Sequence, residues 1–139
     1  ESASISFDGA DLTGASIVDS RFADATFHRA CLDHLSVEDS HFERASFSQT
    51  SFVEAKFIDS HFKGVQLAGA VLDGATFDHA RMQKSNLTGA SLRNGTFSEL
   101  QLQGATCDGA NFDHSRLNFA DFSGATLRSA SFRRAVLAD

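Results

Sequence analysis

Residues 10–29 read ADLTGASIVDSRFADATFHR, and every fifth residue of this stretch, beginning with Leu12, is apolar. The same spacing runs from Phe7 to Leu137 without an insertion or a deletion, so that 27 successive positions hold Phe, Leu, Ile, Val, Met or Cys. The chain contains no proline that could interrupt the pattern. A period of five therefore organises the chain, and we call these 27 positions the central residues.

Neither regular secondary structure can bury residues that recur at this period. An α-helix advances about 100° per residue, so a step of five scatters the apolar side chains around the helix. In a flat strand, five is an odd number, and successive apolar residues would point to opposite faces of the sheet. A coil that turns by about a right angle per repeat keeps all of them inside. Four repeats then close a square, and residue n stacks on residue n+20, as in solenoid repeat proteins.

The residue two positions before each central residue is usually small. In this small column Ala occurs 16 times and Ser five times, because the position points inward at a place where only a small side chain fits. The other three positions of each repeat are mostly polar and face outward. Glycine occupies nine of the 27 positions that lie two places after the central one. We call these the corner positions, because the chain turns there and glycine permits a positive φ.

Several segments match the repeat of a known family: Ala10–Gly14 (ADLTG), Ala110–Phe112 (ANF) and Ala120–Gly124 (ADFSG). The chain resembles the pentapeptide-repeat family in a register that covers residues 5–139. The resemblance implies an all-β fold, a right-handed quadrilateral β-helix, here a solenoid of about seven coils, each made of four pentapeptides, with no projecting loops. We expect residues 1–139 to form a single domain.

The resemblance is less specific about function. Members of the family include proteins that mimic DNA and protect bacterial gyrase from quinolones, secreted effectors, and many arrays without a known role. The motif therefore predicts a scaffold, and a fold alone does not imply a function.

The overall charge narrows the class of partner. With 18 acidic and 12 basic residues the net charge is −6, which argues against binding to nucleic acid or to an anionic membrane and suits a basic protein partner. No apolar run approaches the length of a membrane span, and no secretory signal is visible. We favour a cytoplasmic location, with a secreted effector as the alternative, and we expect no cofactor.

Because residue n stacks on residue n+20, the charged residues sort into four faces. The most acidic face, centred on Ile17 and its equivalents, carries seven acidic and two basic residues, a net charge of −5. Asp19, Asp39 and Asp59 should form a vertical ladder of like charge, which destabilises a fold unless a neighbour neutralises it. We expect a solvated acidic face whose charge is partly offset by the Arg and Lys column of the next face, which has a net charge of +2. The candidate partner-binding residues of the acidic face are Asp19, Glu38, Asp39, Asp59, Asp78 and Glu99.

The histidines are candidate metal ligands. His41 and His61 occupy equivalent positions of consecutive coils and should stack, in a column whose next member on either side is an arginine. Asp39 and Asp59, two residues away, are the only plausible carboxylates for a metal site here, and the flanking arginines disfavour a cation. We therefore expect a polar stack and no metal site.

A catalytic site is not expected either. The interior of so narrow a coil is filled by side chains, and no loop projects to form a cleft. No nucleophile has a base placed beside it by the register. We expect the chain not to be an enzyme.

Few apolar residues are expected to face the solvent. Phe119 is the only Phe outside the central column, and it occupies a corner position, so it is a candidate hydrophobic contact. Val136 and Leu137 add apolar surface to the last coil, and the end of an isolated β-helix presents an unpaired backbone edge. We expect end-to-end pairing through this edge, most simply in a two-fold homodimer.

These observations predict a non-catalytic scaffold or protein–protein interaction module. The alternative is a DNA mimic that binds a type II topoisomerase, DNA gyrase, and modulates inhibition by quinolones. A length of B-DNA equal to this rod carries about twenty phosphate charges, whereas the most acidic face offers a net charge of −5. The low charge density favours the scaffold.

Overall fold

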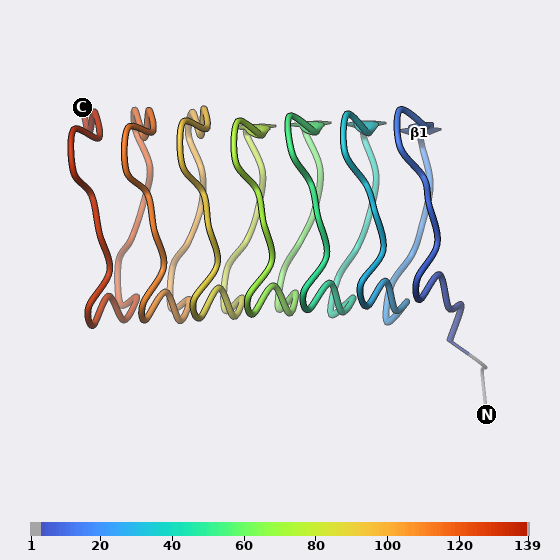
Figure 1. The fold of residues 1–139 in the computed structure, drawn as a ribbon. Helices are drawn as coiled ribbons and strands as arrows, with labels where there is room; N and C mark the ends of the chain where they lie inside the picture. Colours follow the sequence, from blue (N-terminus) through green and yellow to red (C-terminus); the bar gives the residue numbers. More distant parts are fainter. Residues whose placement is uncertain (1–3, 139) are drawn as a thin grey trace.

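The chain winds into a stack of square coils. A computed structural model describes residues 4–138, and residues 4 and 138 lie at opposite ends of the stack (Figure 1). Equivalent residues of successive coils pair as parallel strands at an interval of 20, as in the bridges from Arg21 to His41 and from His41 to His61. The predicted quadrilateral β-helix is confirmed. No helix among residues 4–138 is long and apolar enough to cross a membrane.

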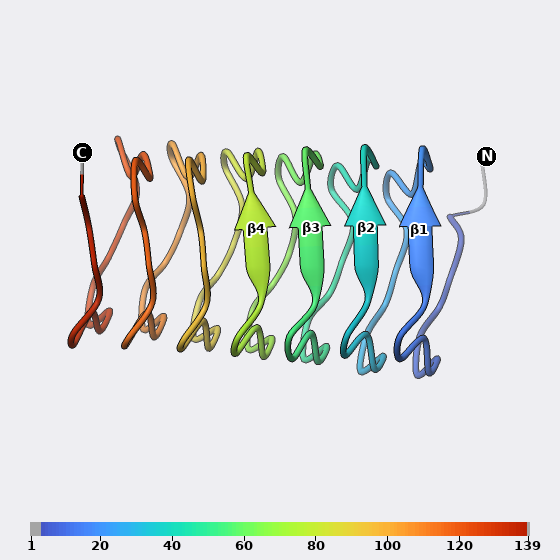
Figure 2. The same ribbon diagram turned by 90° about the horizontal axis from the view of Figure 1, so that it is seen from above.

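One face of the rod carries all four named strands. They lie side by side in the order β1-β2-β3-β4 of a parallel sheet, as Figure 2 shows from above. The register places Phe57 between Val37 and Phe77, as the sequence period predicts. Each strand has three residues because a corner follows it. The strands are β1 (Ser16–Val18), β2 (Ser36–Glu38), β3 (Lys56–Ile58) and β4 (Thr76–Asp78).

The corners have a left-handed backbone whether or not they contain glycine. Nine glycines and 17 other residues, together 26 corner positions, have a positive φ, from 48° at Asp19 to 72° at Gly64. At most corners the amide of the next small-column residue donates to the carbonyl of the central residue, as Ala10 does to Phe7 at 2.9 Å. This hydrogen bond and the positive φ are features of a type II turn. Glycine therefore identifies only some of the corners, because the coil imposes the same backbone conformation at all of them.

Serine side chains close three corners of the β1–β4 face instead. The Ser40 hydroxyl donates to the Glu38 carbonyl at 2.9 Å and accepts from the amide of Ser20 at 3.1 Å. Ser60 repeats this arrangement one coil later, with the Ile58 carbonyl at 2.9 Å and the amide of Ser40 at 3.4 Å. Serine replaces alanine here because its hydroxyl accepts from a backbone amide, that of Ser20 or Ser40, to which the turn offers no carbonyl.

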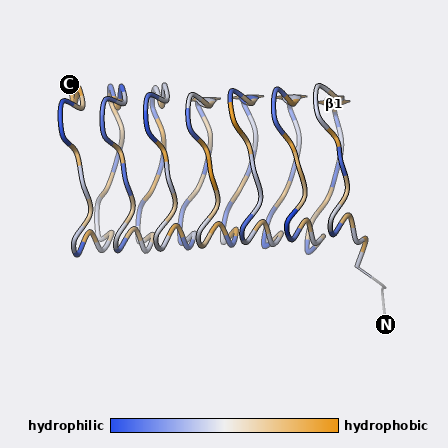
Figure 3. Ribbon diagram, viewed as in Figure 1, coloured by the Kyte–Doolittle hydropathy of each residue, from blue (hydrophilic) through white to orange (hydrophobic). Residues whose placement is uncertain are grey.

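Central residues stack in columns along the rod axis. Apolar and polar segments recur in each coil (Figure 3), and the buried core extends from Ala25 to Leu117. Phe57 and Phe77 stack with ring centroids 4.4 Å apart. The small column is equally constrained, since a Cβ added to Gly95 would lie 2.3 Å from the ring of Phe97.

The register can be tested at adjacent residues of β3. Phe57 is 1% exposed, so Phe57→Ala should lower the free energy of unfolding by about 3–5 kcal/mol through lost burial and a residual cavity. Lys56→Ala, at an exposed neighbouring position, should change it by no more than about 0.5 kcal/mol. Urea unfolding measures both changes, and equal effects would refute the register.

The serine ladder predicts opposite effects at two equivalent positions. Ser40→Ala leaves the partly buried amide of Ser20 without its acceptor and should cost about 1–3 kcal/mol. Ala80 occupies the next place in this column after Ser60, so Ala80→Ser should offer an acceptor to the amide of Ser60 and stabilise the fold by about 0.5–1.5 kcal/mol. The midpoints of urea unfolding report both effects. If Ala80→Ser destabilises as much as Ser40→Ala, the hydroxyls do not act as described.

Candidate partner-binding surface

Three exposed carboxylates follow strands β1, β2 and β3. Asp19, Asp39 and Asp59, which we call the acidic ladder, occupy successive corner positions with φ of 48°, 48° and 50°. The amide of Asp39 donates to the Ile58 carbonyl at 3.2 Å, and that of Asp59 to the Asp78 carbonyl at 3.1 Å. The backbone therefore holds these residues one coil apart, a strand spacing of about 4.8 Å.

The ladder is not neutralised at ion-pair distance. Among residues 4–138, no cationic side chain forms an ion pair with Asp19, Asp39 or Asp59. The one Arg–Asp ion pair in this part of the chain joins Arg44 to Asp24, with a closest contact of 2.6 Å. Among the described residues the neighbouring Arg and Lys column therefore makes no ion pair with the ladder, and Arg44 pairs instead with Asp24 of its own column.

The other predicted acidic residues have different surroundings. Asp78 and Glu99 both contact His79, at 3.7 Å and 3.1 Å respectively. Glu38 is exposed between Val18 and Ile58, which are exposed on the same face. The register thus brings the predicted residues onto one face, although Asp78 and Glu99 share an imidazole that can offset their charge.

Phe119 continues the corner column of the acidic ladder. It is 63% exposed and has a φ of 58°, a conformation that costs a bulky residue roughly 1–2 kcal/mol relative to a right-handed one. Its ring borders a shallow groove lined by Glu99, Gln101, Gln103 and Asp121. Because the coil imposes a positive φ at every described corner, what sets Phe119 apart is its large exposed apolar side chain at a position that elsewhere holds glycine or a polar residue.

The C-terminal coil also exposes apolar side chains. Val136 and Leu137 are 48% and 57% exposed, in agreement with the sequence prediction. The end-to-end homodimer that they suggest stays a prediction.

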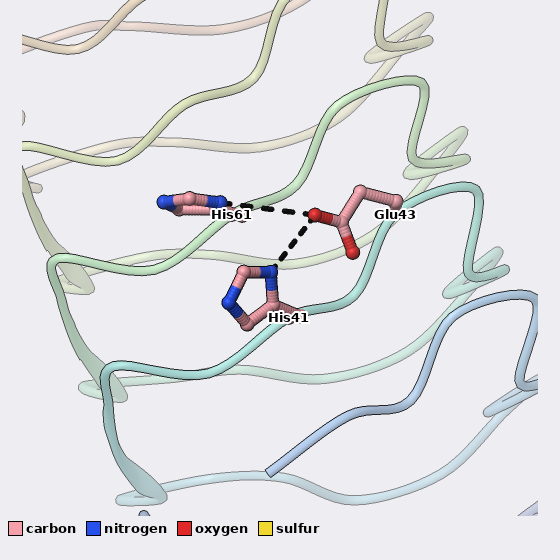
Figure 4. Close-up of side chains that lie close together, drawn as sticks. All are labelled: His41, Glu43 and His61. Atoms are coloured by element: carbon pink, nitrogen blue, oxygen red, sulfur yellow. Dashed lines mark hydrogen bonds and ion pairs between the residues drawn. The ribbon is translucent and has the colours of Figure 1, made fainter. Parts of the chain in front are cut away.

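A second cluster lies on the adjacent face, where the carboxylate of Glu43 contacts two neighbouring imidazoles from one side (Figure 4). Its Oε1 lies 3.0 Å from Nδ1 of His41 and 3.7 Å from Nδ1 of His61. The rings of the two histidines have centroids 4.4 Å apart. The two histidines are neighbours on consecutive coils, as predicted, but their rings meet edge to face at an interplanar angle of 67°. The carboxylate beside them is Glu43, and the prediction that only Asp39 and Asp59 could serve is wrong. The sequence carried the signal for Glu43, because His41 and Glu43 flank the central residue Phe42 and therefore both point outward.

The cluster affects two pKa values. Burial alone would raise the pKa of Glu43, but hydrogen bonds from His41 and from its own amide, with the charges of both imidazoles, bring that pKa below its ordinary value. Burial lowers the pKa of His61, and the nearby charges of His41 and Arg81 lower it further. These directions favour an ionised carboxylate beside a neutral imidazole.

A surface groove separates the ladder from this cluster. The groove has a volume of about 570 Å³ and is lined by Asp39, Asp59, His61, His79, Arg81 and Gln101. Acidic and basic side chains therefore face the same recess without pairing across it.

Two sequence profiles match the chain. The profile described as "Pentapeptide repeat region" matches residues 35–112, and "Pentapeptide repeats (8 copies)" matches residues 5–44 and 97–134. No protein with a curated description matches the chain in sequence.

Solved structures share the fold. Full-length QnrB1, a plasmid-mediated fluoroquinolone resistance protein, gives a TM-score of 0.57 at 18% identity, over 91% of this chain and 88% of that one. A trypsin-treated QnrB1 variant gives 0.51 at 22% identity, over 93% and 78% of the two chains. A pentapeptide repeat protein from the thylakoid lumen of Arabidopsis thaliana is 28% identical over 84% and 71%, with a TM-score of 0.44. The likeness to QnrB1 shows the fold alone.

The acidic ladder should lower the stability of the isolated rod. Changing Asp19, Asp39 and Asp59 together to Asn removes two neighbouring like-charge contacts, each costing roughly 0.2–1 kcal/mol, and Asn tolerates a positive φ. Thermal unfolding should therefore shift to higher temperature, by more at low than at high salt. A shift that ignores salt would show that repulsion is not the cause.

Proposed function

The chain belongs to the pentapeptide-repeat family, and from that premise we propose that it is a non-catalytic scaffold that binds a basic protein surface through the acidic ladder and Phe119. One observation carries the proposal. Three exposed carboxylates stand one coil apart without a cationic partner among residues 4–138, on a protein that pairs other carboxylates.

The ladder suits a partner that presents several lysines or arginines. No donor within the described part of the chain binds these three carboxylates, whereas Asp33 accepts from the Ser51 hydroxyl and from the amide of Val53. Cations of a partner would attract the carboxylates and would also reduce the repulsion between neighbouring carboxylates. Both effects would favour binding. Charge complementarity of this kind raises the rate of association and orients the partner.

Apolar contacts would supply the second part of the interface. Val18 and Ile58 are exposed beside the ladder, and Phe119 is exposed further along the same corner column. Aromatic residues that enter a pocket of the partner often dominate binding energy. Phe119 is the only apolar side chain at a corner of the described residues, which fits a residue retained for contact.

The filled interior supports a non-catalytic role. The inward-facing large side chains are packed within the core, and the grooves of residues 4–138 lie between outward-facing polar side chains. A site built there would rest on the surface of a rigid rod, as is usual for recognition by solenoid proteins.

A DNA mimic that binds a type II topoisomerase is the second candidate. It is favoured by the fold shared with QnrB1, a fluoroquinolone resistance protein, together with the row of carboxylates. The charge density argues against it, since the three carboxylates of the ladder span about 10 Å, and the same length of B-DNA carries about six phosphate charges.

Variants of the ladder test the proposed function. The intact rod, immobilised, should retain basic proteins in a salt-sensitive manner, and the variant with Asp19, Asp39 and Asp59 changed to Asn should lose most of this binding. Phe119→Gly should weaken binding at least tenfold while the rod becomes more stable, because glycine relieves the positive φ. Retention of the same proteins by the ladder variant would contradict the proposal.

A matched control separates local from overall charge. Asp33, Asp73 and Asp113 change the net charge by the same amount when replaced by Asn, and the amide oxygen can still accept their hydrogen bonds. This variant should bind as the wild type does. An assay of gyrase supercoiling decides the second candidate: we expect no inhibition at micromolar protein, and inhibition that the ladder variant abolishes would favour the DNA mimic.

A further inference from the structure

We propose that His41, Glu43 and His61 form a binding site for a divalent transition metal ion, with Zn²⁺ as the best fit. The sequence prediction of no metal site considered Asp39 and Asp59 as the carboxylates. The structure places Glu43 beside both imidazoles instead (Figure 4). The proposed site is independent of the acidic ladder and of the proposed function.

The backbone holds the three side chains in position. His41 and His61 pair directly as neighbours in a parallel ladder. Their amides donate to the carbonyls of Ser20 and Ser40, each at 2.9 Å. Glu43 leaves the same coil as His41, on the other side of Phe42. Two consecutive coils therefore supply the donors, and a bound ion would link them.

The spacing of the donor atoms suits a small ion. One nitrogen of each imidazole and one carboxylate oxygen all lie within 4.8 Å of one another. Tetrahedral Zn²⁺ with bonds of about 2.0–2.2 Å requires donors about 3.3 Å apart. The distances of 3.0 Å and 3.7 Å to Glu43 bracket this value. The third distance, between the two imidazole nitrogens, is at most 4.8 Å. The side chains are 27–33% exposed, so small rotations can shorten this distance.

The donor set selects the class of metal. Two imidazoles and one carboxylate are a known set for Zn²⁺, with a fourth position open to water or another ligand. Mg²⁺ and Ca²⁺ prefer oxygen donors, so two imidazoles disfavour them. The other histidine–carboxylate contacts among residues 4–138 contain a single imidazole each, as in the pair of His79 with Glu99.

The surrounding charges favour an anionic fourth ligand. Glu43 and His61 border a groove whose other lining residues include Lys63, Arg81 and Lys84. These cations weaken the attraction for a metal ion and strengthen the attraction for an anion bound to it. We therefore expect moderate affinity, which should increase when Arg81 is replaced by Gln.

Titration calorimetry with Zn²⁺ tests the site. The metal-free wild type should bind one Zn²⁺ at neutral pH and should not bind Mg²⁺ under the same conditions. His41→Gln, His61→Gln and Glu43→Gln should each weaken Zn²⁺ binding at least tenfold. His79→Gln is the matched control, because it removes an imidazole with a carboxylate partner outside the cluster, and it should leave the affinity unchanged.

A second measurement needs no variant. Co²⁺ added to the wild type should give the visible absorption of a tetrahedral site and should broaden the imidazole proton resonances of His41 and His61 before those of the other four histidines. Unchanged Zn²⁺ affinity in folded His61→Gln, equal loss in His79→Gln, or broadening spread evenly over all histidines would overturn the proposal.

Discussion

The structure depends on one constraint, that every central side chain must point to the axis of the rod and stack on its equivalent in the next coil. Rings such as Phe27 and Phe47, with centroids 4.6 Å apart, fill most of the coil, so that the neighbouring column is mainly alanine or serine and holds a larger buried residue such as Leu35 or Leu100 only in places. Burial of these columns is the main favourable contribution to folding. The hydrogen-bonded ladders, the corners and the faces all follow from this stacking. Once the central residues are in register, the face and the coil on which each outward residue lies are fixed as well.

The stacking explains why so much of the fold could be predicted. A period of five has one solution that keeps all central residues inside, so the coil and its faces follow from counting. The corners were harder, because residues such as Arg44 and Gln49 adopt a positive φ that the closed coil imposes against their own preference. Ser20 and Ser40 read in the sequence as small residues, since only the turn geometry shows which backbone groups need a hydroxyl.

The candidate sites were predictable to the level of the face and no further. Counting places Asp19 above Asp39, but side-chain rotamers decide whether an arginine turns toward them or toward Asp24. The role of Glu43 depends on two outward positions flanking one inward residue, which is a rule of this coil that ordinary strand or helix periodicity does not contain. Both sites sit on positions that the core does not need, so they can carry unfavourable charge or strain while the columns supply the stability.

The division of each coil into four repeats also makes the rod sensitive to the length of an insertion or deletion in an unusual way. Loss of one repeat would preserve the core, because one central residue would replace another, yet every downstream side chain would turn by a quarter of a revolution about the axis. A deletion of this kind between His41 and His61 would leave a folded rod in which the two imidazoles occupy adjacent faces. Loss of a whole coil would only shorten the rod. Insertion or deletion of a whole coil therefore keeps every residue on its face. Insertion or deletion of a single repeat rotates the part of the rod that follows it relative to the part that precedes it.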